Sequence, residues 1–341
     1  MIEVETLAGY QAVRENGAGI IDITTRGRIR VEGTEAIMFL NGLITNDMKT
    51  LALHRWMPAA FPNVQGRLIA AIRVARLSDR DEKSPRFLLD TEEATHAAVL
   101  KTIERFTLAG DFKVNDVTTT TAMISIQGRK SAEIIQQLCD ATTEQYGVVE
   151  TTFAGKDLLV LRSTHTAEDG FDLIVDSENY DSLAKALIAA GAVSVSPETF
   201  ETLRIEAGIG RFGKDMDETN VITEANLDDA VSFTKGCYIG QEIIARIKYR
   251  GHVAKKLTGL TFDKSGPVTV GETIKNDEGK DIGRITSESF SPTLNRPIAL
   301  GYVRYEQLAA GTEVVVGEGE LKASVTQLPF VRGSWYENEA E

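Results

Sequence analysis

The chain has 341 residues, of which 42% are hydrophobic and 26% are charged. At roughly 150 residues per domain, this length predicts about two domains, and the composition is that of a globular protein with a full core. No run approaches the roughly 18 apolar residues of a transmembrane helix, so we expect no membrane association. The net charge of −13 argues against binding of duplex nucleic acid over the whole surface, although it allows a local basic patch.

Cysteine usage and the first residues predict a reducing compartment. Cys139 and Cys237 are the two cysteines, and they form neither a CxxC pair nor a disulfide framework. The first ten residues, MIEVETLAGY, contain no basic segment followed by an apolar one, so no secretory signal is predicted. We therefore expect a cytoplasmic protein.

The first two-thirds of the chain predicts a mixture of helices and strands. Thr34 is placed to cap a helix that runs to Leu43 with apolar residues on one face. Ser196 and Pro197 suit the N-cap and the first position of a later helix that ends at Gly208. Between them the patterns predict a strand at 66–75, a charged hairpin or loop at 77–86, a strand at 87–89, a helix at 92–106, a strand at 122–126, a helix from 128 to 138, strands at 158–161 and 171–175, and a helix at 179–190.

The pattern changes near residue 257. Short β-rich segments then alternate with Gly, Pro and Asn turns, at 257–262, 281–286, 298–303, 313–316 and 322–326. Such spacing predicts a small all-β barrel of about 75 residues. We expect one domain at 1–250 and a second at 257–333.

Two kinds of site are excluded by their context. Residues 208–213, GIGRFG, match GxGxxG, but a predicted helix precedes them and the acidic loop 214–218 follows. A dinucleotide fingerprint needs a strand before the motif and a helix after it. The four histidines, at positions 54, 96, 165 and 252, share no metal-ligand spacing with each other or with a cysteine, so no metal site is predicted.

The stretch 233–242, FTKGCYIGQE, carries the strongest chemical signal. Lys235 lies two positions before Cys237 and would favour its thiolate, and a helix that starts near Gln241 would add its dipole. Tyr238 offers a stacking face, and the Gln241 amide can both donate and accept. The alternative is that Cys237 is a small buried hydrophobe, as most free cysteines are.

A cluster of basic side chains follows this stretch. In a chain of net charge −13 it predicts a local positive patch, formed by Arg246, Lys248, Arg250, Lys255 and Lys256. The patch is either an anion site, for carboxylates or an RNA phosphate, or a solvated strand edge or linker. Tyr249 is the single interleaved aromatic residue, so we expect no strong direct nucleic-acid binding.

An ordered set of motifs resembles one known family over nearly the whole chain. KGCYIGQE at 235–242, followed by AR at 245–246 and YRG at 249–251, resembles the signature of the YgfZ-type folate-binding proteins, which assist iron–sulfur cluster assembly or repair. They are a branch of the glycine-cleavage T-protein (aminomethyltransferase) superfamily. The supporting motifs are FLNGLITND at 39–47, NVQGR at 63–67, DGFD at 169–172, LRIEAG at 203–208, NLD at 226–228, GRITS at 283–287, SPTL at 291–294 and IALGYV at 298–303.

The resemblance implies an α+β fold, in which a T-protein-like folate-binding domain with ferredoxin-like subdomains precedes a small C-terminal β-barrel. It also implies tetrahydrofolate or a one-carbon derivative as the cofactor. A pterin presents an edge of two adjacent N–H donors, which one carboxylate can satisfy. Glu206, at a helix end, is our candidate, and the alternatives for it are an exposed side chain or an ion pair with Arg204.

Further folate-binding residues follow from the same resemblance. Arg246 or Arg250 would bind the glutamate tail of the folate. The other cofactor-binding candidates lie in motifs that resemble cleft-lining segments, and they are Asn41, Thr45, Asn46, Arg67, Lys235, Tyr238 and Gln241. For Asn46 the alternative is that it caps the end of a helix.

The chain departs from the T-proteins in one strand. They carry Gly-Gly-x-x-Asp-Asp, and one of these aspartates assists chemistry at the folate nitrogen, whereas residues 66–71 here read GRLIAA. The methyl groups of Ala70 and Ala71 cannot manage a proton. T-proteins also have Gly-Arg-Glu where 240–242 is GQE here, and they have no cysteine at the position of Cys237.

We therefore expect a tetrahydrofolate-binding protein that helps to assemble or repair iron–sulfur clusters in client enzymes, including enzymes that modify tRNA. Cys237 would act as a thiolate ligand or a persulfide relay, and a client enzyme or cluster carrier protein would supply the other cluster ligands. The alternative is a tetrahydrofolate-dependent aminomethyltransferase, which Ala70 and Ala71 disfavour. A third hypothesis is a folate sensor without thiol chemistry.

Overall fold

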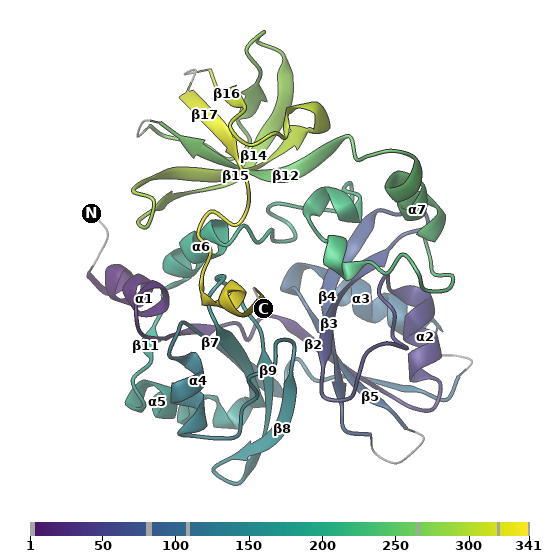
Figure 1. The fold of residues 1–341 in the computed structure, drawn as a ribbon. Coiled ribbons are helices and arrows are strands. Elements are labelled where there is room, and N and C mark those ends of the chain that lie inside the picture. Colours follow the sequence, from purple (N-terminus) through teal and green to yellow (C-terminus); the bar gives the residue numbers. More distant parts are fainter. Residues whose placement is uncertain (1–3, 80–83, 107–109, 264–265, 319–320, 340–341) are drawn as a thin grey trace.

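The protein consists of two β-sheets flanked by helices and a β-barrel, arranged around a common centre (Figure 1). The computed structural model describes residues 4–79, 84–106, 110–263, 266–318 and 321–339. The barrel lies at the top of Figure 1, the first sheet at the right and the second at the lower left. None of the helices in these ranges is long and apolar enough to cross a membrane.

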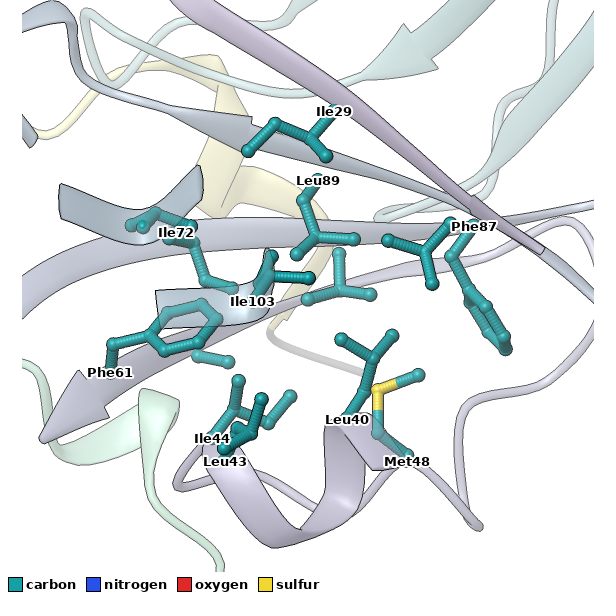
Figure 2. Close-up of a cluster of buried hydrophobic side chains, with 14 of the residues drawn as sticks. Ile29, Leu40, Leu43, Ile44, Met48, Phe61, Ile72, Phe87, Leu89 and Ile103 are labelled. Atoms are coloured by element: carbon teal, nitrogen blue, oxygen red, sulfur yellow. The ribbon is translucent and has the colours of Figure 1, made fainter. Parts of the chain in front are cut away.

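The first sheet is five-stranded and antiparallel, with the order β3-β4-β5-β2-β6. Helices α2 (Ala36–Leu43) and α3 (Glu93–Phe106) pack on it. A continuous apolar core fills the space between strands and helices (Figure 2), because alternate strand residues such as Ile72 and Leu89 meet Leu40 and Ile103 of the helices. The strands are β2 (Gly27–Glu32), β3 (Trp56–Pro62), β4 (Leu68–Leu77), β5 (Arg86–Thr91) and β6 (Lys113–Asp116).

The second sheet is six-stranded, with the order β11-β1-β7-β10-β9-β8, and only the short β1–β11 pair is parallel. Its central strand β7 is buried at every position. The strands are β1 (Gly19–Asp22), β7 (Thr121–Gln127), β8 (Val148–Phe153), β9 (Lys156–Arg162), β10 (Gly170–Asp176) and β11 (Val193–Ser194). The accompanying helices are α1 (Val4–Arg14), α4 (Ser131–Gln136) and α5 (Tyr180–Ala189).

Helix α6 (Pro197–Glu206) links this second sheet to the barrel. Its start is as predicted, since the Ser196 side chain accepts a hydrogen bond from the Thr199 N–H at 3.2 Å and Pro197 occupies the first turn. The helix packs against α1 on one side and against the barrel on the other. Residues 208–213 leave it as a loop, so GIGRFG lacks both the strand and the helix of a dinucleotide fingerprint.

The C-terminal barrel is closed by six antiparallel strands, in the order β12-β15-β14-β13-β16-β17. This confirms the predicted α+β fold with a C-terminal barrel. The strands are β12 (Lys255–Phe262), β13 (Thr273–Lys275), β14 (Asp281–Ser291), β15 (Arg296–Arg304), β16 (Glu313–Val316) and β17 (Leu321–Thr326). After the barrel, the chain descends past α6 to the centre of the molecule in Figure 1, where the Trp335 carbonyl accepts from the Gln145 side chain.

Of two local predictions, one is wrong and one holds only in part. Thr34 does not cap α2, whose N-cap is Glu35 without a side-chain hydrogen bond; Thr34 donates to the Asp111 carboxylate at 2.7 Å instead. The basic cluster is a strand edge or linker only in part: its first three members, Arg246, Lys248 and Arg250, lie on helix α7 (Gln241–Arg250), whereas Lys255 and Lys256 begin strand β12. Part of the predicted hairpin at 77–86 lies outside the described residues.

Candidate functional site

A cavity of about 660 Å³ lies between the second sheet, α6 and the start of α3. Its volume is within the range of roughly 300–1,000 Å³ that is usual for small-molecule sites. Strands β1 and β7 supply an apolar wall, while Phe200 and Phe212 add aromatic faces. The polar lining side chains are Asp22, Arg26, Glu92, Glu93, His165, Tyr180, Arg204 and Arg211. An apolar cavity with a few convergent polar groups is the usual form of a ligand site.

His165 is held in the cavity wall by a buried carboxylate. The Asp172 side chain, on β10, accepts hydrogen bonds from His165 Nε2 at 3.0 Å, from Ser163 at 2.7 Å and from Arg73 at 2.5 Å. Asp172 has 0% exposure. Burial alone would raise the pKa of this carboxyl, but His165 and Arg73 hold it well below its ordinary value. Asp172 is therefore ionised, and it fixes the orientation of the His165 ring.

The same network continues into the first sheet. Arg73, on β4, also pairs with Asp90 of β5 at 2.5 Å. Asp90 in turn receives two hydrogen bonds from Arg26, at 2.8 and 2.9 Å. These charged side chains are largely buried, and each lies next to a side chain of opposite charge, which offsets the cost of removing it from water. The two sheets are thus joined by one ionic chain that ends at two cavity residues, Arg26 and His165.

A second buried ion pair joins the cavity to the barrel. Arg204, on α6, donates to the Asp215 carboxylate at 2.7 Å, and Asp215 accepts from Thr286 and Ser287 of β14, each at 2.7 Å. Arg204 also binds Glu201 one turn earlier in the helix. Helix α6 is consequently fixed to the barrel at the position where it lines the cavity.

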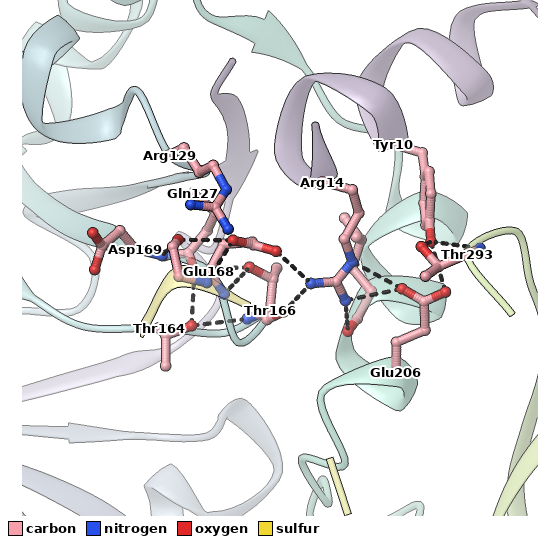
Figure 3. Close-up of polar contacts among 12 residues, drawn as sticks. Tyr10, Arg14, Gln127, Arg129, Thr164, Thr166, Glu168, Asp169, Glu206 and Thr293 are labelled. Carbon is pink, nitrogen blue, oxygen red and sulfur yellow. Dashed lines mark hydrogen bonds and ion pairs between the residues drawn. The ribbon is translucent and has the colours of Figure 1, made fainter. Parts of the chain in front are cut away.

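Glu206 lies elsewhere, at the junction of α1, α6 and the barrel (Figure 3). Its side chain has 0% exposure and accepts from Tyr10 at 2.7 Å, from Ser291 at 2.5 Å and from Arg14 at 2.9 Å. Neither alternative proposed from the sequence is correct, because Glu206 is not exposed and its ion pair is with Arg14 rather than Arg204. Both carboxylate oxygens are thus engaged within the protein.

The loop that carries Cys237 forms a separate region beside α2 and α7. Cys237 is exposed, so the alternative of a buried hydrophobe is wrong. The Lys235 ammonium donates to the carbonyls of Asn41, Ile44 and Asn46 at 2.8, 2.9 and 2.7 Å, at the C-terminal end of α2. Burial lowers the pKa of Lys235 to about 8, while the nearby Asp47 opposes this decrease. Lys235 therefore anchors the loop to α2, and its three donor hydrogens point to carbonyls.

The other residues predicted from the sequence stabilise or flank this same region. The Asn41 side chain accepts a hydrogen bond from the Met48 N–H. The side chains of Thr45 and Asn46 donate to the carbonyls of Ala230 and Pro58, respectively. Arg67 donates to the Thr219 carbonyl, and Gln241 donates weakly to the Lys235 carbonyl. The Tyr238 ring is buried beneath the Lys235 ammonium, at 5.0 Å. Arg246 and Arg250 are exposed on α7. Of the described residues that line the cavity, none is a residue predicted from the sequence.

Comparison with known proteins identifies the family. The GCVT N-terminal domain matches residues 4–235, and the glycine cleavage T-protein C-terminal barrel domain matches residues 255–332. Aminomethyltransferases from Thermotoga neapolitana and Caldanaerobacter subterraneus subsp. tengcongensis are each 31% identical to this chain, over 95% and 96% of it and 88% of their own length.

The chain belongs to the glycine-cleavage T-protein family. The fold agrees, since the crystal structure of the glycine cleavage system aminomethyltransferase T from Bartonella henselae superposes with a TM-score of 0.88, covering 96% of this chain and 90% of that one at 24% identity.

In this T-protein family member, the strand that departs from the Asp-Asp pattern is β4. Ala70 has 0% exposure and belongs to the apolar core of the first sheet, and Ala71 pairs with Ala60 of β3. Neither position carries a group that can exchange a proton. The titratable groups of the cavity are instead on β1 and the loop after it, on α5, at the start of α3, on α6, on the loop after β9 and on the loop after α6.

Sequence reasoning missed the cavity residues because their signals were weak. Asp172 is the last residue of the DGFD motif and stands within a run of apolar residues, which is the one local sign that its carboxylate is buried and paired. His165, Arg26 and Glu92 lie in short polar stretches without a distinctive pattern.

Proposed function

We propose that this protein binds tetrahydrofolate, or a one-carbon derivative of it, in the cavity between the second sheet and α6. The match of both T-protein domains along the chain is the observation that carries this proposal. The cavity supports it, because a folate combines a flat pterin and an aromatic ring with an anionic glutamate tail. The apolar wall and the rings of Phe200 and Phe212 suit the flat parts of such a ligand.

The charged residues of the cavity suit the remaining parts of the ligand. Arg211 lines the cavity, is 33% exposed, pairs with Glu201 at 3.3 Å and lies over the Phe200 ring at 5.5 Å, and it is our candidate for binding the anionic tail. His165, oriented by Asp172, offers a ring nitrogen to the pterin or to its one-carbon substituent. When bound, the folate would supply the nitrogen atoms that carry the one-carbon group.

Aminomethyl transfer is the activity that the comparisons favour. The relatives with that name match this chain over 88% of their own length. Transfer requires a proton to be moved at a nitrogen atom, and Ala70 and Ala71 cannot do this. In this chain, we assign that step to two cavity side chains, Glu92 and His165, whose ring is oriented by Asp172.

The second candidate is assistance in iron–sulfur cluster assembly or repair, and the exposure of Cys237 favours it. The loop of Cys237 is fixed to α2 by Lys235 and precedes the basic helix α7. Within the described part of the chain, no group of three or more His, Cys, Asp or Glu side chains could hold a metal ion. A client enzyme or a cluster carrier protein would therefore supply the remaining cluster ligands.

The test has two stages. Isothermal titration with 5-formyl-tetrahydrofolate, a stable reduced folate, measures binding, and failure to bind at millimolar concentration would reject the proposal.

The purified protein is then assayed for tetrahydrofolate-dependent release of ammonia from an aminomethylated lipoyl carrier. In parallel, the unchanged chain and Cys237→Ser are expressed in a strain without its own YgfZ-type gene, and one iron–sulfur tRNA-modifying enzyme is assayed. Turnover establishes aminomethyl transfer, while rescue by the unchanged chain alone establishes the second candidate.

A further inference from the structure

The second half of helix α7 carries cations that have no acidic partner. Arg246, Lys248 and Arg250 are exposed, and none of them forms an ion pair within the part of the chain that the structure describes. By contrast, Lys256 at the start of the barrel pairs with Asp228 at 3.0 Å. On a chain of net charge −13, the three cations of α7 form a local positive surface. Such a surface suits an anionic partner.

Aromatic rings lie among these cations. Phe233, in the loop before α7, is half-buried; its ring lies 5.1 Å from the Lys248 ammonium and meets the Tyr249 ring edge to face at 6.2 Å. The Tyr249 side chain is 67% exposed. Because Tyr249 packs against a second, partly buried ring, it offers a positioned flat surface to solvent.

The connection from α7 to the barrel extends this surface (Figure 1). The His252 ring stacks on the Tyr305 ring, with centroids 3.9 Å apart and an angle of 13° between the planes. The Tyr305 N–H donates to the Ala254 carbonyl at 3.1 Å, which fixes the short helix η5 (Tyr305–Gln307) to the connection. Tyr305 is 45% exposed, and Arg304 beside it is exposed as well. Rings and cations therefore continue from α7 to the edge of the barrel.

Together these side chains form one surface, the α7 stripe. It consists of Phe233, Arg246, Lys248, Tyr249, Arg250, His252, Arg304 and Tyr305. The sequence showed a single aromatic residue among the cations, Tyr249, whereas the fold adds the rings of Phe233 and Tyr305. The acidic side chains next to the stripe along the chain are Glu242 and Glu306, both exposed. The four lysine and arginine side chains outnumber them, so the stripe is positive overall.

We propose that the α7 stripe binds single-stranded loops of RNA, with phosphates on its arginine and lysine side chains and unstacked bases on Tyr249 and Tyr305. Proteins that bind single strands combine cations that follow the phosphates with aromatic rings on which the bases stack. An acidic protein segment would use the cations alone and would leave both exposed rings unused. The inference does not depend on folate binding.

The extent of the stripe favours a loop of a folded RNA. Such a loop presents a few unstacked bases between phosphates, which matches a surface confined to one helix and the connection after it. The acidic remainder of the chain repels phosphate, so binding is restricted to the stripe. Because the contacts to phosphate are exposed, the affinity depends strongly on salt.

The test uses the full-length protein and a fluorescein-labelled RNA hairpin with a loop of about seven uridines, and it measures binding by fluorescence anisotropy. We expect saturable binding with a dissociation constant below about 100 µM at about 50 mM salt. Raising the salt to about 200 mM should weaken binding by roughly 10- to 50-fold, as expected for three or four phosphate contacts. The same stem as a blunt duplex should bind at least about fivefold more weakly, because its bases are already stacked.

Variants separate stacking from charge. Tyr249→Ala should weaken binding of the hairpin by roughly 5- to 50-fold, whereas Tyr249→Phe, which keeps the ring, should bind like the unchanged chain. Arg250→Gln should weaken binding at low salt and reduce the slope of log affinity against log salt by about 0.7. The matched controls are an exposed ring and an exposed lysine outside the stripe, and Phe290→Ala and Lys101→Gln should leave binding unchanged.

Four results would overturn the inference. They are absence of binding at about 100 µM, equal binding of the hairpin and the blunt duplex, equal losses in the control variants, and full binding by Tyr249→Ala. In the last case, displacement of the RNA by a glutamate decapeptide of similar affinity would identify an acidic protein segment as the partner. The melting temperature of each variant establishes that it is folded, and Tyr305→Ala repeats the stacking test if Tyr249→Ala is not.

Discussion

Arg73 on β4 donates to Asp172 on β10 across 2.5 Å, and this ion pair joins the two sheets next to the cavity. The residues are 99 positions apart in the chain. Each sheet supplies one buried charge of the pair, and Asp172 also binds His165, so the contact between the sheets is linked to the orientation of His165. The stability of the fold and the geometry of the cavity therefore depend on the same contact.

Removing one member of this pair should destabilise the whole protein. Asp172→Asn leaves the buried Arg73 with a single carboxylate partner, Asp90, and we expect the free energy of unfolding to fall by about 3–5 kcal/mol. Urea unfolding followed by circular dichroism measures this change. Asp157→Asn, at an exposed position on the neighbouring strand β9, is the control and should change stability by less than about 0.5 kcal/mol. Equal midpoints for both variants would show that the ion pair contributes nothing.

Glu201 should make stability depend on pH in the acid range. Burial would raise its pKa, but Arg204, together with Lys214 and Arg211, lowers it to about 2 from its ordinary value of 4.5. Because the folded pKa is the lower one, the contribution of Glu201 is present above about pH 4.5 and is lost as the pH falls towards 2. Glu201→Gln should cost about 2–3 kcal/mol at pH 7 and much less near pH 2.

Urea unfolding of both proteins at several pH values measures this dependence. Glu178→Gln, at an exposed position, is the control and should show no such change between pH 7 and 2. A cost of Glu201→Gln that is the same at both pH values contradicts the prediction.

The two cysteines should react at very different rates. Cys237 is exposed, whereas Cys139 is half-buried, and burial, reinforced by Asp140, raises the pKa of its thiol to about 11. Since the thiolate is the reactive form, Cys139 is almost entirely protonated at pH 8. Alkylation with iodoacetamide followed by peptide mass spectrometry should find Cys237 modified first. Comparable modification of both residues at early times would be inconsistent with this structure.

Lys235 should control the position of the Cys237 loop. Lys235→Met removes a buried ammonium that satisfies three carbonyls at the end of α2, so we expect a loss of about 1–3 kcal/mol in the free energy of unfolding. The loop should also detach more often, which would speed the alkylation of Cys237. Lys49→Met, at an exposed lysine near the same helix end, is the control and should change neither quantity. If Lys235→Met leaves the alkylation rate unaltered, the loop is held by other contacts.

Local patterns in the sequence determined much of the fold. Ser196 and Pro197 define the start of α6 through contacts within one turn, and the strands of the barrel follow from short apolar segments separated by turn residues. These elements can be predicted from the sequence because the contacts that determine them are made within a few residues along the chain. Where a nearby tertiary partner competes, the local rule fails, as when Thr34 binds Asp111 instead of capping α2.

The Lys235 ammonium fixes the Cys237 loop to three carbonyls at the end of α2, and α7 follows the loop along the chain. What only the tertiary structure decided is which charged groups meet. Glu206 pairs with Arg14, 192 positions away, and Glu92 accepts from Phe212, 120 positions away. A buried charge must find compensation in space, and separation along the chain carries no information about that partner. The cavity, its His165–Asp172 pair and the contact of Glu92 with Phe212 are therefore properties of the folded protein that the sequence did not reveal.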